Sequence, residues 1–266
     1  MKTMKWIRIV IIGLVLVVGI IALGMYAWKE FAVEKSNPNN YTTIGEIPTP
    51  DGYERVDGDD PEYGKFLRSL PLKPKGAIVK YYFGTIADLQ DLNYAVVDLP
   101  LLSNAEQCAD VCMRLRAEYL YSKGRYSDIH FLNVQGKVLK YSGGESRKEF
   151  EDYLRHVFDV ANTYSLDQEM SIRKLSDIQP GDVFVYPATS QRYGHAIMVA
   201  DVAQNPETDG KAIMLVEGFM PARSIHILQN WRDSSISPWF ILDEEGGCLT
   251  FAMFEFNAAN LKYFSE

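Results

Sequence analysis

The sequence predicts an α+β domain with an antiparallel sheet, because helical and strand-like segments mix without the regular alternation of a parallel sheet. Of the 266 residues, 47% are hydrophobic and 12% aromatic, enough to form one sizeable core. The clearest helix covers 147–161, where Phe150, Leu154 and Phe158 share one apolar stripe. The clearest strands form a hairpin over 181–199, in which two apolar segments flank a polar turn.

The remaining elements follow from local signals. Ser103 and Glu106 have the spacing of a capping box, which predicts a helix that ends near Ser122, before Gly124. A short amphipathic helix is expected after Asn257. Segments rich in β-branched and aromatic residues predict strands at 76–83, 94–99, 128–141, 212–217, 225–228 and 239–242.

The first 28 residues predict a transmembrane anchor. Lys2, Lys5 and Arg8 precede an uncharged apolar run of 20 residues from Ile9 to Trp28, which is long enough to cross a bilayer as a helix. The basic flank favours a cytoplasmic N-terminus. A cleaved signal peptide is the alternative, since residues 22–24 resemble a small-residue cleavage site.

This anchor sets the expected domain organisation. A linker is expected over 29–46 because Ser, Asn and Pro cluster there without periodicity. Residues 47–266 are then expected to form one extracytoplasmic domain on the periplasmic side of a single-pass membrane protein. The cell envelope would be its place of action.

Charge and composition exclude several classes of partner. All 35 acidic residues follow the expected anchor, whereas three of the 27 basic residues precede it, so the expected domain is acidic. Acidity argues against nucleic acid as a partner. The four scattered histidines predict no metal site, and no cofactor motif occurs. Three cysteines are an odd number, so at least one thiol has no disulfide partner within the chain. Cys248 could form a disulfide with Cys108 or with Cys112. The alternative is that all three are small buried side chains.

Three residues predict a cysteine hydrolase, which needs a thiolate, a histidine that takes its proton and a polar group that holds the imidazole. Cys108 lies on the expected 103–122 helix, His195 opens the second strand of the hairpin, and Glu217 ends a later strand. If Val202 and Ala212 flank the turn and pair with each other, a symmetric antiparallel register puts His195 opposite Phe219. Glu217 then lies diagonally across from His195, with backbones about 7–8 Å apart. A slip of one residue would move Glu217 to the other face. Gln107 is a weaker candidate for an oxyanion donor, and His130 is the alternative base.

Each of these residues also has a structural interpretation. Cys108 and Cys112 are then core residues and His195 is a hydrogen-bonded strand residue, so the chain is a non-catalytic binding or scaffold domain. If Ser103 caps the helix, Cys108 lies beyond the first turn, where the helix dipole assists a thiolate most. His226 alternates with apolar neighbours and is expected to face solvent or a groove. A structural helix face is expected for Arg114, Arg116, Glu118 and Tyr119.

Motifs from residue 47 to the end resemble one bacterial family, the domain of unknown function 4846. They are IPTPDGY at 47–53, FLR at 66–68, LPLK at 70–73, QCAD at 107–110, RLRAEYL at 114–120, DIHF at 128–131, IQPGDVF at 178–184, GHA at 194–196, MPA at 220–222, IHIL at 225–228 and SPW at 237–239. The resemblance implies an exported or lipid-anchored protein and no assigned activity. The chain departs from the family in having Glu217 where glutamine is expected. Its segment 133–144 is also shorter than expected and lacks a tryptophan-bearing stretch, which puts a shared ligand in doubt.

A looser resemblance covers the hairpin and the helix-borne cysteine alone. Together they are similar to papain-like hydrolases of the NlpC/P60 and CHAP types. This likeness implies a papain-like fold and an amidase or peptidase that acts on cell-wall peptide. Cys108 would attack, His195 would act as base and then as acid, and Glu217 would orient His195. Transferase chemistry on the same pair is an alternative that the sequence does not separate from hydrolysis.

Overall fold

A computed structural model describes residues 14–21, 23–24, 36–242 and 249–265 of the chain. Its helices are α2 (Pro61–Arg68), α3 (Cys108–Ser122), α4 (Arg147–Val160) and α5 (Thr163–Glu169). Its strands are β1 (Glu54–Arg55), β2 (Asn93–Val96), β3 (His130–Leu132), β4 (Val138–Lys140), β5 (Ser171–Ile172), β6 (Val183–Tyr186), β7 (His195–Gln204), β8 (Lys211–Glu217), β9 (His226–Leu228), β10 (Trp239–Ile241), β11 (Leu249–Phe251), β12 (Phe254–Phe256) and β13 (Leu261–Tyr263).

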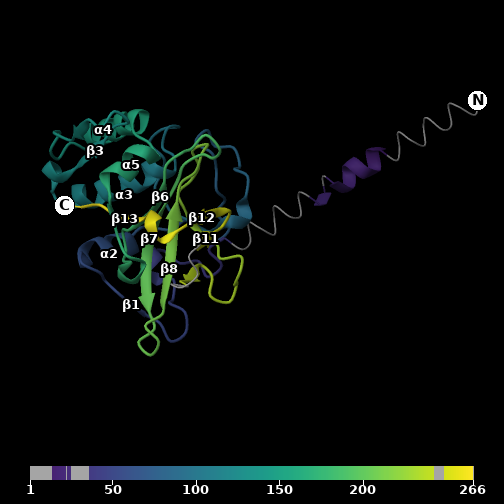
Figure 1. Cartoon of the computed structure of the whole chain (residues 1–266). Helices are drawn as coiled ribbons and strands as arrows, with labels where there is room; N and C mark the ends of the chain where they lie inside the picture. Colours follow the sequence, from purple (N-terminus) through teal and green to yellow (C-terminus); the bar gives the residue numbers. More distant parts are fainter. Residues whose placement is uncertain (1–13, 22, 25–35, 243–248, 266) are drawn as a thin grey trace, which may run out of the picture.

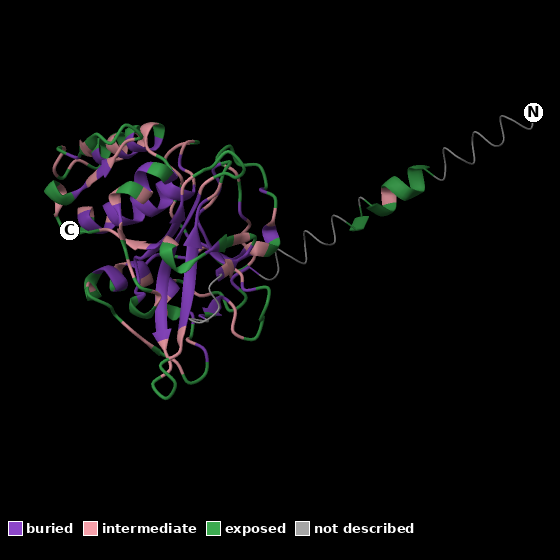
Figure 2. Ribbon diagram, viewed as in Figure 1, coloured by how far each residue is buried: buried purple, intermediate pink, exposed green. Residues whose placement is uncertain are grey.

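One antiparallel sheet organises the described part of the chain. Seven of its nine strands follow the order β2-β9-β8-β7-β6-β13-β5, with β1 paired to β7 and β10 paired to β8. The long β7–β8 hairpin lies at its centre and is buried along most of its length (Figures 1 and 2). Two further two-stranded sheets are formed by β3–β4 and β11–β12.

The sheet has a core on each face because apolar side chains of β7 alternate between the two sides. Ala196 and Met198 belong to the larger core, which also contains apolar residues of α2, α3, α4 and α5. Ile197 and Val199 belong to the smaller core, which β11 and β12 cover. A strand buried on both faces reads as a continuous apolar run, which is what β7 shows in the sequence.

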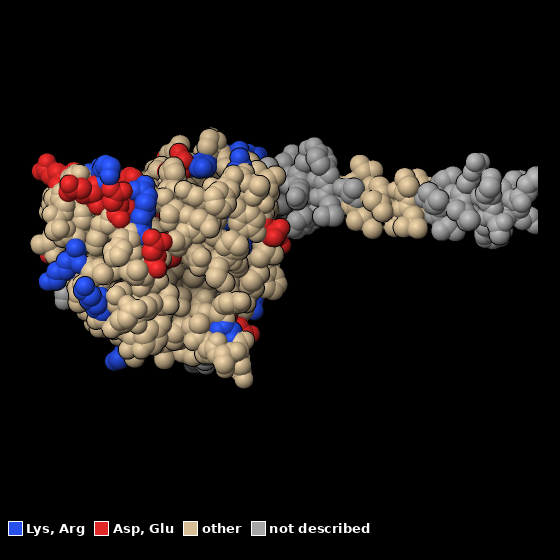
Figure 3. All heavy atoms as spheres, turned by 90° about the horizontal axis from the view of Figure 1, so that it is seen from above, with Lys and Arg blue, Asp and Glu red and all other residues tan. Residues whose placement is uncertain are grey.

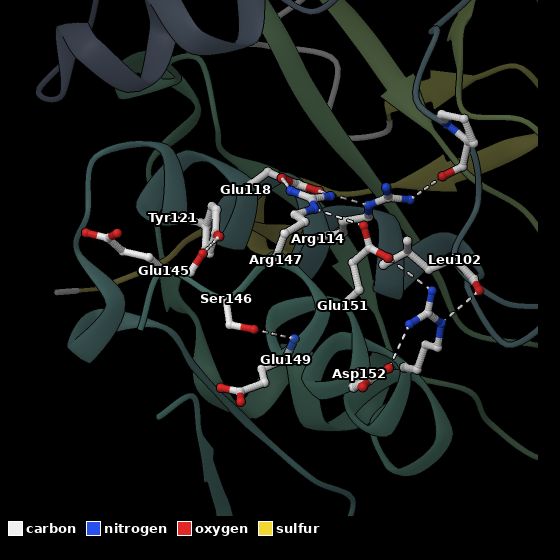
Figure 4. Close-up of polar contacts among 12 residues, drawn as sticks. Leu102, Arg114, Glu118, Tyr121, Glu145, Ser146, Arg147, Glu149, Glu151 and Asp152 are labelled. Atoms are coloured by element: carbon white, nitrogen blue, oxygen red, sulfur yellow. Dashed lines mark hydrogen bonds and ion pairs between the residues drawn. The ribbon is translucent and has the colours of Figure 1, made fainter. Parts of the chain in front are cut away.

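Helix α4 is amphipathic and binds α3 through an ion-pair network. Its buried face includes Phe150 and Leu154. Arg147 makes two hydrogen bonds to the Glu118 carboxylate of α3, of 2.6 and 2.7 Å, and a third to Glu151 (Figure 4). Seen from above, charged side chains of both signs gather on the side of the molecule where α4 lies (Figure 3).

Several expected elements differ from the structure. Residues 76–83 form isolated bridges, such as Lys80 with Ile86, because a tight turn follows instead of a paired strand. The helix expected after Asn257 is a 3₁₀ turn followed by β13, which fills the sheet position between β6 and β5. Helices α2 and α5 were not predicted, since both are short. Residues 36–46 of the expected linker contact the domain, and Asn37 is fully buried with its amide nitrogen 2.8 Å from Tyr41 O.

The predicted papain-like (NlpC/P60-type) fold is corrected. The structure shows a mostly antiparallel sheet with helices, in a strand order that is not shown to be papain-like. The prediction rested on one hairpin and one helix. Such local elements leave the pairing of the remaining strands open, because that pairing depends on contacts between residues far apart in the sequence.

The predicted transmembrane anchor is also corrected. Within the ranges that the structure describes, no helix combines the length and the apolar character needed to cross a membrane. Three further predictions depended on that anchor and are withdrawn with it. They are membrane attachment through residues 1–28, the single-pass topology and the periplasmic placement of the domain. A long apolar run is necessary for a spanning helix but does not by itself establish one. Half of the segment 9–28, and Cys248 with the disulfide considered for it, lie outside the described residues.

Candidate active site

The thiol of Cys108 lies at the N-terminal end of α3, because the helix starts later than predicted. Gln107 is the N-cap residue, and its backbone N–H donates to Asp110 Oδ2 over 2.9 Å. The predicted capping box is wrong because Glu106 instead accepts from the backbone N–H of Leu102 over 2.6 Å and pairs with Arg114 over 2.7 Å. Cys108 is therefore the first helical residue, where the positive end of the helix dipole favours a thiolate.

His195 faces a carboxylate on the neighbouring strand. The ring lies at the start of β7, and its Nε2 is 3.0 Å from Glu217 Oε2 at the end of β8. Both side chains are buried. Because Nε2 bonds the carboxylate, Nδ1 is the ring nitrogen left for another partner, and the Cys108 side chain is near enough to His195 to raise the pKa of the ring. The structure thus brings the three predicted residues together.

The β7–β8 register explains how Glu217 reaches His195. At the turn Ala203 pairs with Ala212, whereas the predicted register paired Val202 with Ala212, a difference of one residue. A β-bulge between Val199 and Asp201 shifts the pairing by one residue, so that Val199 pairs with Leu215. Beyond the bulge the register equals the predicted one. Without it, Glu217 would point to the other face of the sheet.

A second histidine, which the sequence analysis did not assign to the site, completes the chain of contacts. His226 on β9 is the direct cross-strand partner of Glu217, and its Nε2 is 3.3 Å from Glu217 Oε1. Its Nδ1 lies 3.0 Å from Ser224 O. The expectation that His226 faces solvent or a groove is wrong, since the residue is 2% exposed. The sequence could have predicted this pair, because Glu217 and His226 directly flank the connection 218–225 and a symmetric hairpin register sets them opposite each other.

These contacts decide the charge state of the site. Burial lowers the pKa of His195, but hydrogen bonds with Cys108 and Glu217 outweigh it and raise the pKa to about 9. Burial raises the pKa of Glu217, but hydrogen bonds from His195 and His226 outweigh it and lower the pKa to about 2. At neutral pH His195 is therefore an imidazolium beside a carboxylate.

Aromatic packing fixes the plane of the His195 ring. Phe254 of β12 stacks on it with centroids 3.5 Å apart and an angle of 17° between the planes. Phe219 approaches it edge-on at 5.8 Å. Gly218 lets α3 come close, because a Cβ at that position would lie 2.5 Å from Val111 Cγ2. The imidazole is thus held in one orientation relative to the helix that carries the thiol.

A hollow of about 250 Å³ gives access to Cys108. Its lining includes Gln107, Cys108, Asp110, Thr163, Tyr193 and Met220. Cys112, one turn further along α3, is fully buried, donates its S–H to Cys108 O over 3.4 Å, and has a pKa raised well above its ordinary value by burial. The two thiols are free and neighbouring, but only Cys108 reaches the hollow.

Two donors suited to an oxyanion lie beside this thiol. The backbone N–H of Cys108 belongs to the first helical turn and has no acceptor within the helix. Gln107 lines the same hollow and is only half-buried. His130, the alternative base, is not brought to Cys108, since it lines a different hollow and its Nδ1 lies 2.9 Å from Asp128 O.

Comparisons with known proteins give a family and no activity. A family model described as Domain of unknown function (4846) matches residues 44–144 and 141–263, which together make up most of the chain. A search of the curated proteins and a search of the solved structures found no match. The likeness to papain-like hydrolases therefore gains no support at the level of the fold.

Proposed function

We propose that this chain, which belongs to the family Domain of unknown function (4846), is a cysteine hydrolase that cleaves an amide bond. The observation that carries the proposal is the 3.0 Å contact between His195 and Glu217, with the Cys108 thiol near the same ring at a helix N-terminus. Its geometry gives each partner the role that nucleophilic catalysis requires: a thiol at a helix N-terminus, an imidazole beside it and a carboxylate that fixes the second ring nitrogen.

In the first step the Cys108 thiolate attacks the carbonyl carbon of the amide. The C–N bond breaks as the imidazolium of His195 gives its proton to the leaving nitrogen, and an acyl thioester remains on the sulfur. The Cys108 N–H and the Gln107 side-chain amide, from two residues that line the hollow, would donate to the oxygen that becomes negative in this step. Glu217 is a positioning residue, because it touches the imidazole and not the substrate.

In the second step water attacks the thioester carbon. Neutral His195 accepts the proton of the water, the C–S bond breaks, and the acid leaves while the thiolate–imidazolium pair is restored. An amine in place of water would give a transferase from the same intermediate. Neither step needs a group beyond this chain, its substrate and water.

The lining of the hollow indicates what a substrate needs to present. Asp110 is 5% exposed, and its Oδ1 has no hydrogen-bond partner among the described residues. A backbone N–H of a peptide substrate would satisfy that oxygen. Met220 and Tyr193 offer apolar surface beside it. Peptide amides, cell-wall peptides among them, are therefore the substrates to test.

Thiol labelling tests the proposal without a known substrate. Native protein is treated with iodoacetamide at neutral pH, and the labelled peptides are quantified by mass spectrometry over time. Cys108 is expected to react faster than the same thiol in denatured protein, while Cys112 serves as an internal control that reacts only after unfolding. A screen of peptide amides then compares the unaltered chain with Cys108→Ala and Cys112→Ala. A Cys108 that reacts no faster than a denatured thiol would overturn the proposal in favour of a binding or scaffold domain.

A further inference from the structure

A buried arginine on α3 has no anionic partner. Arg116 is 9% exposed, and its guanidinium carbon lies 5.2 Å from the ring centroid of Tyr63, 5.7 Å from that of Tyr119 and 6.0 Å from that of Phe264. Within the described ranges, no hydrogen bond or ion pair to this guanidinium exists. Ring faces compensate a desolvated cation only in part, and its N–H donors remain unused.

The guanidinium borders two hollows of about 450 Å³ each. The first hollow is lined by four acids, which would repel an anion: Asp59, Asp60, Glu62 and Asp182. The second, here called the Arg116 hollow, has only Asp128 and Glu169. Asp128 is paired with Arg125 over 2.6 Å, and Glu169 accepts from the backbone N–H of Leu132 over 2.9 Å. Burial raises the pKa of Glu169 to about 7, so its charge is weakened at neutral pH.

The other polar residues of the Arg116 hollow favour an anion. Lys140 of β4 lines it and, within the described ranges, has no carboxylate partner. His130 bonds the backbone with Nδ1, which leaves Nε2 for another partner. The Arg116 hollow thus holds two cationic side chains, Arg116 and Lys140, that form no ion pair with the described residues, and their charge draws an anion toward it.

The walls of the same hollow are apolar. Leu120 of α3, Val138 of β4 and the rings of Phe131 and Phe264 line it. The two rings meet edge-on with centroids 6.3 Å apart. A hollow of this size and lining suits a small organic molecule, with few polar contacts that fix its orientation.

We propose that the Arg116 hollow binds a small molecule that carries one oxyanion on an apolar body. The oxyanion pairs with the Arg116 guanidinium and Lys140, and the apolar body packs on Phe131 and Val138. Carboxylates and phosphates share this chemistry, because both match the planar fork of a guanidinium. The site shares no lining residue with the Cys108 hollow, so the inference stands independently of the hydrolase proposal.

Calorimetric titration of the full chain tests the site with three probes of one shape class: benzoate, phenyl phosphate and neutral benzamide. Benzoate or phenyl phosphate is expected to bind at least about 10-fold more tightly than benzamide, which is what charge-assisted hydrogen bonds contribute. The tighter of the two identifies carboxylate or phosphate as the natural group.

Variants locate the binding. Lys140→Gln is expected to weaken anion binding by a few-fold and Arg116→Gln by about 10-fold or more, because a desolvated guanidinium contributes more than an exposed ammonium. Lys137→Gln is the matched control: it removes the same charge from the same hairpin but does not line the hollow. If both anions bind no better than benzamide, or if Lys140→Gln and Lys137→Gln bind alike, the inference is overturned. Lys140 and Lys137 are exposed, so both variants are expected to fold even if Arg116→Gln does not.

Discussion

Buried ionisable groups at the start and in the middle of α3 have opposite surroundings. At the N-terminal end, Cys108, His195, Glu217 and His226 form a chain in which each ionisable group contacts the next. Two turns along the same helix, the guanidinium of Arg116 lies against aromatic rings and forms no ion pair with the described residues. Groups that exchange protons with one another need internal partners, whereas a group that binds a charged ligand needs its partner to come from outside.

Arg114 shows that the contrast is specific to Arg116. It lies two residues earlier on α3 and is also buried, yet its guanidinium bonds Glu106 over 2.7 Å and Pro100 O over 2.8 Å. The helix therefore carries one arginine that serves the fold and one that is left open. Both were predicted to belong to a structural helix face, and the proposed anion site would give Arg116 a second role.

The largest effect is expected from removing the thiol. Cys108→Ala should lower the rate of amide hydrolysis by about 10³-fold or more, because the acyl intermediate then has no atom on which to form. Cys112→Ala should leave the rate within a few-fold, since its sulfur does not reach the hollow. Steady-state rates on an amide identified by the screen measure both. Equal losses in the two variants would show that Cys108 acts through packing alone.

Removing the carboxylate that positions His195 should have the next largest effect. Glu217→Ala is expected to lower kcat by about 10²–10⁴-fold, because the imidazole loses its fixed orientation and its stabilised charge. KM should change little, since Glu217 does not touch the hollow. Glu207→Ala, in the exposed β7–β8 turn, removes the same side chain and should be neutral. A loss confined to KM would contradict the positioning role.

The two arginines provide a test of stability. Arg114→Met is expected to lower the free energy of unfolding by about 3–5 kcal/mol, because it leaves Glu106 buried and unpaired. Arg116→Met should cost about 1 kcal/mol or less, since it orphans no acid and loses only contacts with rings. Urea unfolding of both variants gives the comparison. Similar losses would mean that Arg116 has a partner in the fold.

The smallest predicted effect is a shift in the titration of His195. Glu217→Gln keeps a hydrogen-bond acceptor for the ring but removes the charge, so the pKa of His195 should fall from about 9 by about one unit or more. Because the folded-state pKa is raised, the associated stability is full below pH of about 6.5 and is lost as the pH rises through 9. Titration of the ring by NMR, in both proteins, measures the shift independently of activity. An unchanged pKa would mean that Cys108 alone sustains the imidazolium.

Local sequence signals located most helices and strands but misplaced the start of α3, which carries Cys108. The apolar stripe of α4 and the long runs of β7 and β8 were predictable, because periodicity reports which faces are buried. The start of α3 was not predictable, because the Ser103–Glu106 spacing matches a capping box whereas the folded chain pairs Glu106 with Arg114. That difference moved Cys108 from the second turn of the helix to its first residue.

The candidate site was predicted in part for the same reason. Residue types and the hairpin register suggested Cys108, His195 and Glu217. The register at the turn was wrong by one residue, and a bulge that no local signal announces restored it. The role of His226 depends on the pairing of β8 with β9. The membrane anchor was predicted from the apolar length and the basic flank, and neither depends on the folded chain.

The sequence by itself determined which groups the proposed chemistry uses: a cysteine near a helix start, a histidine at a strand start and an acid at a strand end. The tertiary structure decided which of these groups lie together. It also decided that Arg114 pairs with an acid whereas Arg116 forms no ion pair with the described residues. The physical reason is that periodicity and propensity act over a few residues, whereas charge pairing and sheet register depend on segments that only the folded chain brings together.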